Sequence, residues 1–270
     1  MKFSVLLSIY HKEKPDYFDR CMQSIWEKQS VQPNEVVLVE DGPLTEPLYH
    51  MIDKWKKILD KSLVVIVLKE NVGLGKALNI GLQQCRYELV ARMDTDDISL
   101  PDRFATQLEI FKMHNIDICS AWVGEFHDSQ SNIVSYRKVP KTHEEIICFA
   151  KKRNPMNHPA VMYKKSKVLE AGGYKTMTGF EDYYLWARMI LSGAKFYNIQ
   201  KPLVNMQTGE SQLQRRRGIS YAKDEIRFQR RLVMLKFITY REFLSNISLR
   251  FIARTVPSSI TKFIYSYLRR

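Results

Sequence analysis

The chain has 270 residues, with 42 Lys and Arg against 29 Asp and Glu, so its formal net charge is +13. A hydrophobic fraction of 45% excludes a disordered chain, and the length allows one large domain or two small ones. Excess positive charge attracts polyanions such as nucleic acids and anionic membranes. Residues 212–270, however, hold 14 Lys and Arg against 3 Asp and Glu, whereas residues 1–211 hold 28 against 26. We therefore predict a nearly neutral body, residues 1–211, and a basic tail, residues 212–270.

The cysteines and the apolar segments bear on compartment and membrane topology. The four cysteines are widely spaced and form no Cys-x-x-Cys pair, which is typical of reduced thiols in an intracellular protein. The apolar run at residues 3–10 is short and is followed by charges rather than by a cleavage site of small residues. No apolar stretch approaches the roughly 20 residues that a transmembrane helix needs. We expect a cytoplasmic protein that does not span a membrane.

Strand-like and helical patterns alternate through the first half of the chain. The expected elements are strands at residues 3–10, 35–40, 63–68 and 88–93, and helices at residues 17–29, 48–59 and 75–85. Near-continuous apolar strands alternating with helices predict an α/β fold with a parallel sheet covered on both faces. Ligands of such sheets bind at the carboxyl ends of the strands, so the residues that follow each strand are candidates for a site.

The pattern changes after residue 93. A helix at residues 101–114, strands at 116–123 and 133–139, and a helix at 181–191 are expected there. No internal repeat and no linker separates these elements before about residue 212. The body therefore reads as a single domain.

An acidic cluster follows the fourth expected strand, in the segment Arg92-Met93-Asp94-Thr95-Asp96-Asp97. Three carboxylates within four residues repel one another unless a cation neutralises them or they face water. The spacing excludes an EF-hand, because the positions that need Gly and Glu hold Ser99 and Ala105. A metal site and an acidic turn before a helix both remain open.

Three further segments carry polar residues in suggestive positions. The glycine-rich segment at residues 71–79 lacks the Gly-Lys-Ser/Thr of a phosphate loop and the third glycine of a dinucleotide fingerprint, which favours a turn that opens a helix. Glu181 and Asp182 stand at an expected helix start, where carboxylates complement the helix dipole or serve as a general base. His158, next to Asn157, is either structural or part of a site.

Five motifs occur in a fixed order along residues 3–210. They are Ser8-Ile9-Tyr10 with Glu13, the strand end at Asp41, Asn71-x-Gly73-x-x-x-Ala77-x-Asn79, Arg92-x-Asp94-x-Asp96-Asp97, and Gly179-x-Glu181-Asp182. Together they resemble the motifs of family 2 glycosyltransferases with the GT-A fold, in particular bacterial enzymes of O-antigen and exopolysaccharide assembly. Processive synthases of this family carry Gln-x-x-Arg-Trp beside transmembrane helices. Here the segment Gln214-Arg215-Arg216-Arg217-Gly218 lacks the Trp, which favours transfer of a single sugar.

The resemblance implies a nucleotide-sugar site and a divalent metal. The residues implied in donor binding are Ser8, Tyr10, Glu13, Asp41, Lys76, Arg92, Asp94 and Asp96. Within this set Asp41 would bind the nucleotide base, and Asp94 would lie near the ribose. Asp96, with Asp94 beside it, would hold the Mn²⁺ or Mg²⁺ that bridges the diphosphate.

The resemblance also implies an inverting transfer of one hexose, from UDP-glucose or UDP-galactose to a lipid-diphosphate-linked sugar. Asp182 would be the catalytic base and Glu181 would position the acceptor, with Asn157 and His158 on the acceptor side. A protein with that role would act at the inner face of the cell membrane.

The tail reads as amphipathic helices. One apolar stripe comprises Tyr240, Phe243, Leu244, Ile247 and Phe251, and a second comprises Ile260, Phe263, Ile264, Tyr267 and Leu268. Lys and Arg beside such stripes are typical of helices that lie on anionic lipid. Packing on the body and a homo-oligomer interface are the alternatives.

Two other functions fit parts of the sequence. Net charge and the Arg215–Arg217 run suggest a nucleic-acid-binding protein, but the charge avoids the α/β body and no nucleic-acid-binding signature is present, so nucleic acid is not the expected partner. A nucleotidyltransferase with a two-metal site would share the carboxylates but would need a glycine-rich, basic triphosphate loop.

Overall fold

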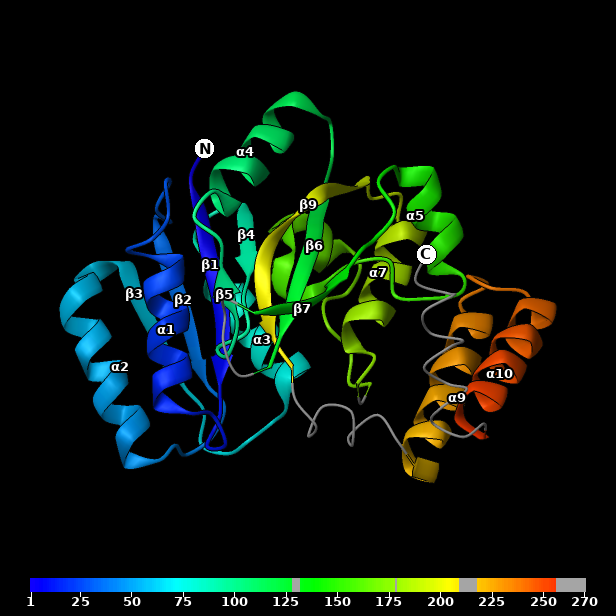
Figure 1. Cartoon of the computed structure of the whole chain (residues 1–270), viewed down its shortest axis with the longest axis horizontal. Coiled ribbons are helices and arrows are strands. Elements are labelled where there is room, and N and C mark those ends of the chain that lie inside the picture. Colours follow the sequence, from blue (N-terminus) through cyan, green and yellow to red (C-terminus); the bar gives the residue numbers. More distant parts are fainter. Residues whose placement is uncertain (128–131, 178, 209–217, 256–270) are drawn as a thin grey trace. The chain divides into compact units, whose positions relative to one another are not determined.

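The computed structural model describes residues 1–127, 132–177, 179–208 and 218–255 (Figure 1). The chain divides into two compact units, one made of residues 1–150 and 154–209 and the other of residues 151–153 and 210–270. The predicted boundary between residues 211 and 212 falls outside the described residues and stays a prediction.

The first unit is built on one mixed sheet with the strand order β3-β2-β1-β4-β8-β6-β9-β5, and with β7 beside β6. The strands are β1 Phe3–Ile9, β2 Glu35–Glu40, β3 Leu63–Val67, β4 Leu89–Arg92, β5 Ile98–Ser99, β6 Ile118–Phe126, β7 Ile133–Arg137, β8 Met162–Lys164 and β9 Phe196–Gln207. Strands β1 to β4 run parallel, which confirms the predicted α/β class. Ile9 pairs with Glu40 on β2, and Leu6 pairs with Arg92 on β4, so these three strands end at one edge of the sheet.

Helices cover both faces of this sheet. They are α1 Pro15–Ile25, α2 Glu46–Leu59, α3 Leu74–Gln84, α4 Arg103–Met113, α5 His143–Ala150, α6 Lys165–Glu170 and α7 Glu181–Leu191, with 3₁₀ turns at Asp60–Ser62 and His158–Ala160. One core holds side chains of α1, α2 and α4, and the other holds side chains of α3, α5, α6 and α7. Val36 faces the first core and Val37 the second, because successive side chains of a strand point to opposite faces.

Two glycines allow close approaches near the site. Gly81 lets helix α3 lie close to the sheet, and Gly42 lets two loops lie close to each other. A Cβ on Gly81 of α3 would lie 2.5 Å from Leu6 Cδ1 and 2.7 Å from Val39 Cγ2, so only glycine lets this helix approach β1 and β2 so closely. Gly42 has a φ of +86°, and a Cβ there would lie 2.6 Å from the backbone nitrogen of Asn71. The loop after β2 and the loop before α3 are therefore in contact.

The second half of the first unit contains elements that the sequence patterns did not predict: β5, α5, β8, α6 and β9. The largest omission is β9, a 12-residue strand that pairs with β6 along its length. Its apolar pattern is broken by Lys201-Pro202, and proline cannot donate a ladder hydrogen bond. The register of β6 and β9 shifts on both sides of Trp122, which pairs with Pro202. This bulge lets the strand continue past the proline.

The second unit contains α9 Gly218–Met234 and α10 Tyr240–Thr255. Phe228, Leu232 and Phe237 are buried in it. Residues 151–153 belong to this unit: Lys151 Nζ lies 3.2 Å from Glu242 Oε1. Helix α10 contains the residues of the first predicted apolar stripe of the tail. The second stripe, at residues 260–268, lies outside the described residues. None of the helices described in the chain is long and apolar enough to cross a membrane.

Candidate functional site

The predicted strand-end residues come together at the edge where β1, β2 and β4 end. Ser8 lies near the end of β1 and Tyr10 directly follows that strand. Asp41 follows β2, and Asp94 lies two residues after the end of β4. Since β1 lies between the other two strands, the three segments are neighbours. This edge is where parallel α/β sheets bind their ligands.

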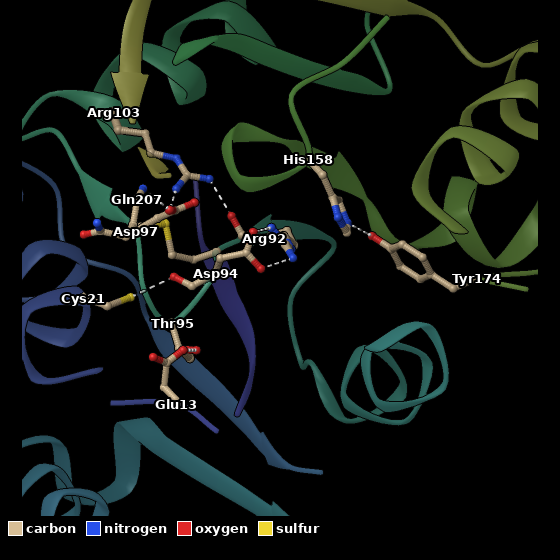
Figure 2. Close-up of polar contacts among 11 residues, drawn as sticks. Glu13, Cys21, Arg92, Asp94, Thr95, Asp97, Arg103, His158, Tyr174 and Gln207 are labelled. Carbon is tan, nitrogen blue, oxygen red and sulfur yellow. Dashed lines mark hydrogen bonds and ion pairs between the residues drawn. The ribbon is translucent and has the colours of Figure 1, made fainter. Parts of the chain in front are cut away.

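An ion pair between Arg92 and Asp94 neutralises the first carboxylate of the acidic turn (Figure 2). The two guanidinium nitrogens Nη1 and Nη2 donate to the two oxygens of Asp94. Burial alone would lower the pKa of Arg92, but the charge of Asp94 outweighs it and the pKa lies above its usual value. Both Asp94 oxygens are therefore engaged by a cation of the protein itself.

The other two carboxylates of the turn have no such partner among the described residues. Burial, followed by the charges of Asp94 and Glu13, raises the pKa of Asp96 to about 7. Burial and the charge of Asp96 also raise the pKa of Asp97, whose Oδ1 accepts a hydrogen bond of 2.8 Å from the backbone of Gln207. Asp97 Oδ2 has no hydrogen-bond partner among the described residues. The ionised forms of Asp96 and Asp97 are therefore disfavoured unless a cation lies close to them.

This donor set fits a hard divalent cation, which takes oxygen ligands and would stabilise the ionised form of these carboxylates. Within the described parts of the chain, no three His, Cys, Asp or Glu side chains are grouped so that they could hold a metal ion. The chain alone would therefore supply few ligands, and a bound substrate would have to supply others.

Contacts from three other parts of the fold hold the acidic turn in place. Arg20 of α1 donates to the carbonyl of Asp96 (3.0 Å) and to Gln207 Oε1 at the end of β9 (3.1 Å). Thr95 Oγ1 donates to Glu13 Oε2 (2.6 Å), which brings the predicted donor residue Glu13 against the turn. Figure 2 shows Glu13 and Thr95 together on one side of the turn, and Gln207 near Asp97.

Asp41 braces the glycine-rich loop that precedes α3. Its Oδ1 accepts from the backbone of Val72 (2.7 Å) and its Oδ2 from the backbone of Gly73 (3.1 Å), while Asn71 Nδ2 donates to its carbonyl (3.1 Å). The loop opens a helix, as the sequence predicts, and the exposed Lys76 lies in the first turn of α3. Contact of Asp41 with a base, and of Lys76 with a donor, stay predictions.

Glu181 and Asp182 begin α7 and lie against the start of α3. A Cβ on Gly75 would be 3.5 Å from Glu181 Cβ. Asp182 accepts from Asn154 Nδ2 through Oδ2 (2.7 Å) and from the backbone of Tyr183 through Oδ1 (2.7 Å). Burial raises the pKa of Asp182, and burial together with Asp182 raises the pKa of Glu181 to about 7. Asp94 contributes to the shift at Glu181, so the two acidic groups are electrostatically linked.

The two predicted acceptor-side residues lie in a buried segment. His158 Nε2 is 2.9 Å from Tyr174 Oη, and burial, followed by the charge of Arg92, holds the pKa of His158 well below its usual value (Figure 2). The ring is therefore neutral at neutral pH. Asn157 has no exposed surface, and its Nδ2 donates to the carbonyls of Ala121 (2.8 Å) and Arg137 (3.0 Å). Contact of either residue with an acceptor stays a prediction.

Two residues of this region, Asn79 and Arg103, were given no role by the sequence patterns. Asn79 holds the backbone of Tyr174 at both ends, because its Nδ2 donates to the carbonyl (2.6 Å) and its Oδ1 accepts from the nitrogen (2.7 Å). Arg103 is fully buried, and burial lowers its pKa to about 9. It donates to the carbonyl of Arg92 (2.7 Å) beneath the acidic turn. Asn79 had a signal, as part of a motif, whereas nothing in the pattern of the sequence marks Arg103.

Comparison with protein families and curated sequences gives consistent matches. The model of the family described as Glycosyl transferase family 2 matches residues 4–171. The chain is 38% identical, over all of its length and 97% of the relative, to an Escherichia coli UDP-Gal:α-D-GlcNAc-diphosphoundecaprenol β-1,3-galactosyltransferase. It is 36% identical, over 99% of both chains, to the amylovoran biosynthesis glycosyltransferase AmsE of Erwinia amylovora.

Solved structures match at lower identity. Staphylococcus aureus TarS 1–349, in complex with UDP-GlcNAc, superposes with a TM-score of 0.64 at 19% identity, over 85% of this chain and 66% of that one. The mannosyltransferase PcManGT of Pyrobaculum calidifontis, in complex with GDP-Man and Mn²⁺, gives 0.59 at 16% identity, over 86% and 62%. The chain spans less than two thirds of the length of these solved chains. The likeness establishes the fold, which is GT-A as expected.

Proposed function

The chain belongs to glycosyl transferase family 2, and from that premise we propose that it transfers one hexose from a UDP-sugar to a lipid-diphosphate-linked sugar, with inversion at the anomeric carbon. The observation that carries this proposal is the proximity of two acidic groups from distant parts of the chain. The turn Asp94–Asp97 is suited to a donor diphosphate. Glu181, next to the candidate base Asp182 at the start of α7, lies close enough for the charge of Asp94 to raise its pKa.

The donor would occupy the edge where β1, β2 and β4 end. Ser8, Tyr10, Glu13 and Asp41 would surround the nucleoside, with Asp94 and its partner Arg92 near the ribose and Lys76 nearer the diphosphate and sugar. Because the curated Escherichia coli relative uses UDP-Gal, UDP-galactose is the first donor to test, followed by UDP-glucose.

Asp96 would hold a divalent cation, Mn²⁺ or Mg²⁺, together with the donor diphosphate. Asp94 would support this site through its charge, because Arg92 occupies both of its oxygens. When bound, such a cation offsets the negative charge that develops on the departing nucleoside diphosphate.

Asp182 would act as the general base. It accepts the proton of the acceptor hydroxyl as that oxygen bonds to the anomeric carbon, while the bond from this carbon to the diphosphate oxygen breaks on the opposite face. Proton abstraction by a positioned carboxylate contributes about 10²–10⁴-fold to rate. Glu181 would orient the acceptor beside it.

The acceptor side would include the Asn157-His158 segment. The curated Escherichia coli relative acts on a GlcNAc-diphosphoundecaprenol, which makes a GlcNAc-diphosphate lipid the acceptor to test here. Asn157 would act by holding this segment in place, because its amide is engaged with two backbone carbonyls. His158 would present an uncharged ring at neutral pH.

A lipid-linked acceptor requires the enzyme to work at a membrane surface. We propose that the basic tail provides this attachment at the cytoplasmic face. Tyr240 and Leu244 of α10 are 65% and 49% exposed, and Arg241 between them is exposed as well. An exposed apolar pair with adjacent Arg is suited to anionic lipid.

A panel of UDP-glucose, UDP-galactose and their N-acetyl forms with a synthetic GlcNAc-diphosphate lipid, with and without EDTA, tests this function. We expect transfer of a single hexose, release of UDP, and loss of transfer in EDTA. A nucleotidyltransferase would release pyrophosphate instead. Absence of any glycosylated lipid across the panel would contradict the proposed substrates.

A further inference from the structure

Asn154 belongs to none of the five motifs, yet it contacts the candidate base directly. We propose that Asn154 is a positioning residue that holds the Asp182 carboxylate in one orientation and favours its ionised form by donating a hydrogen bond to it. This inference rests on the proposed function, because it gives Asp182 the role of base.

The geometry fixes which end of the Asn154 amide faces Asp182. Its Oδ1 accepts from the backbone nitrogen of Met156 (3.3 Å), so its Nδ2 is the end that donates to Asp182 Oδ2 (2.7 Å). Asp182 Oδ1 accepts from the backbone of Tyr183 (2.7 Å). Both carboxylate oxygens are thus held by donors, one from a side chain and one from the helix itself.

The backbone around Asn154 is held by the fold. Pro155 follows it, and a residue before proline is restricted to extended conformations. Pro155 is buried, and its carbonyl accepts from Asn198 Nδ2 of β9 (3.0 Å). The donor therefore occupies a defined position.

Several charged groups act on Asp182 in addition to Asn154. Burial raises its pKa, whereas the donors at Tyr183 and Asn154 and the positive charges of Arg137 on β7 and Arg92 on β4 lower it. The charge of Asp182 in turn raises the pKa of its neighbour Glu181 on α7. Tyr174 also faces this pair of carboxylates, and burial holds its phenol protonated at neutral pH. Asn154 is the uncharged side chain in this set that donates to the carboxylate.

Two substitutions separate positioning from simple packing. Asn154→Ala removes the donor, and Asn154→Asp keeps the shape but places a second carboxylate against Asp182, which raises the pKa of one member of the pair. We expect kcat to fall about 10-fold in Asn154→Ala and further in Asn154→Asp, with the KM for the UDP-sugar unchanged. The acid limb of the kcat profile should move to higher pH by about one unit in Asn154→Ala and by more in Asn154→Asp.

Asn132→Asp, at an exposed position before β7, controls for one added negative charge and should keep the wild-type profile. Circular dichroism and UDP binding verify that each variant is folded. An acid limb at the wild-type pH in both Asn154 variants would overturn the proposal, as would equal, pH-independent losses in the two. Asp182→Asn separates this failure from that of the proposed function: if that variant still turns over, Asp182 is not the base and the premise itself is wrong.

Discussion

The carboxylates of the candidate site differ in the groups that stabilise their negative charge. Arg92 engages both oxygens of Asp94, Asp182 accepts two hydrogen bonds, and Asp97 has one oxygen with no partner among the described residues. Asp96 and Glu181 have pKa values raised to about 7. A ligand that brings positive charge to Asp96 would lower its pKa. Asp182, in contrast, is already held by two hydrogen bonds in the position that its proposed role needs.

Asp182→Asn tests the base directly. The amide keeps the size of the side chain but cannot accept the proton of the acceptor hydroxyl. We expect turnover to fall by about 10²–10⁴-fold, with UDP-sugar affinity within about twofold of wild type. Initial rates with the GlcNAc-diphosphate lipid and calorimetric titration with the UDP-sugar in the absence of acceptor measure the two effects. Near-wild-type turnover in this variant would show that Asp182 is not the general base.

Asp96 and Asp97 should respond differently to removal of charge. Asp96→Ala deletes the proposed metal ligand, so metal-dependent tightening of UDP binding should disappear, as we also expect for the wild type in EDTA. Asp97→Asn keeps the oxygen that accepts from Gln207, so UDP binding should still tighten when Mn²⁺ is added. Titration of UDP with and without Mn²⁺ measures both. The same loss of metal dependence in the two variants would show that Asp97 is also a ligand.

The residues proposed to do the chemistry were easier to predict from the sequence than the residues that hold them in position. Asp94, Asp96 and Asp182 belong to short motifs with fixed spacing, and the structure brings their segments together. Asn154 and Arg103 have no local signal, because their partners lie 28 residues away at Asp182 and 11 residues away at the carbonyl of Arg92. Such contacts depend on how distant segments meet, which periodicity does not encode.

At the scale of elements, the parallel half of the sheet was predictable. Beyond it, α4, β6, β7 and α7 were predicted, whereas β5, α5, β8, α6 and β9 were not. Strand β2 and helix α7 match their predicted ranges, because their apolar patterns are uninterrupted. The helix predicted from residue 101 begins at Arg103, and Asp102 makes no side-chain cap. Strand β9 was missed because Lys201-Pro202 breaks its pattern, and only its pairing with β6 across a bulge reveals one continuous strand.

Asp117 joins three of these elements, and its charge should contribute to stability. It precedes β6, accepts from Lys164 Nζ at the end of β8 (2.9 Å), and accepts from the backbone of Lys195 just before β9 (2.9 Å). Burial would raise its pKa, but these donors outweigh burial and the pKa lies below its usual value. A lowered pKa in the folded state stabilises the protein above the unfolded-state value of about 4, and this contribution is lost as the pH falls through the folded-state pKa.

Asp117→Asn should therefore lower the free energy of unfolding at pH 7 by about 1–3 kcal/mol, and the difference from wild type should shrink below about pH 4. Urea unfolding at a series of pH values measures this. Asp53→Asn is the matched control, because Asp53 forms an exposed ion pair with Lys56 and should change stability by less than about 1 kcal/mol. A loss in Asp117→Asn that is independent of pH would contradict the electrostatic explanation.

For the whole molecule, the net charge of +13 separates into two parts with different consequences. Residues 1–211 carry nearly balanced charges, and their proposed chemistry depends on carboxylates. Residues 212–270 carry most of the excess, and the described part of this segment exposes Arg230, Arg231 and Arg241. The location of the charge, rather than its sum, indicates which part of the chain would meet a polyanion.

Replacing Arg230, Arg231 and Arg241 with Gln should weaken binding to anionic vesicles. Each basic side chain near such a surface contributes about 1 kcal/mol, so three should account for roughly 100-fold in partitioning. The control replaces three exposed lysines of the first unit with Gln: Lys28, Lys61 and Lys112. It removes the same three positive charges and should leave vesicle binding nearly unchanged. Flotation with phosphatidylglycerol vesicles at increasing salt measures the effect, which should weaken as the Debye length shortens. Equal losses in the two triple variants would mean that the total charge, and not the tail, determines membrane binding.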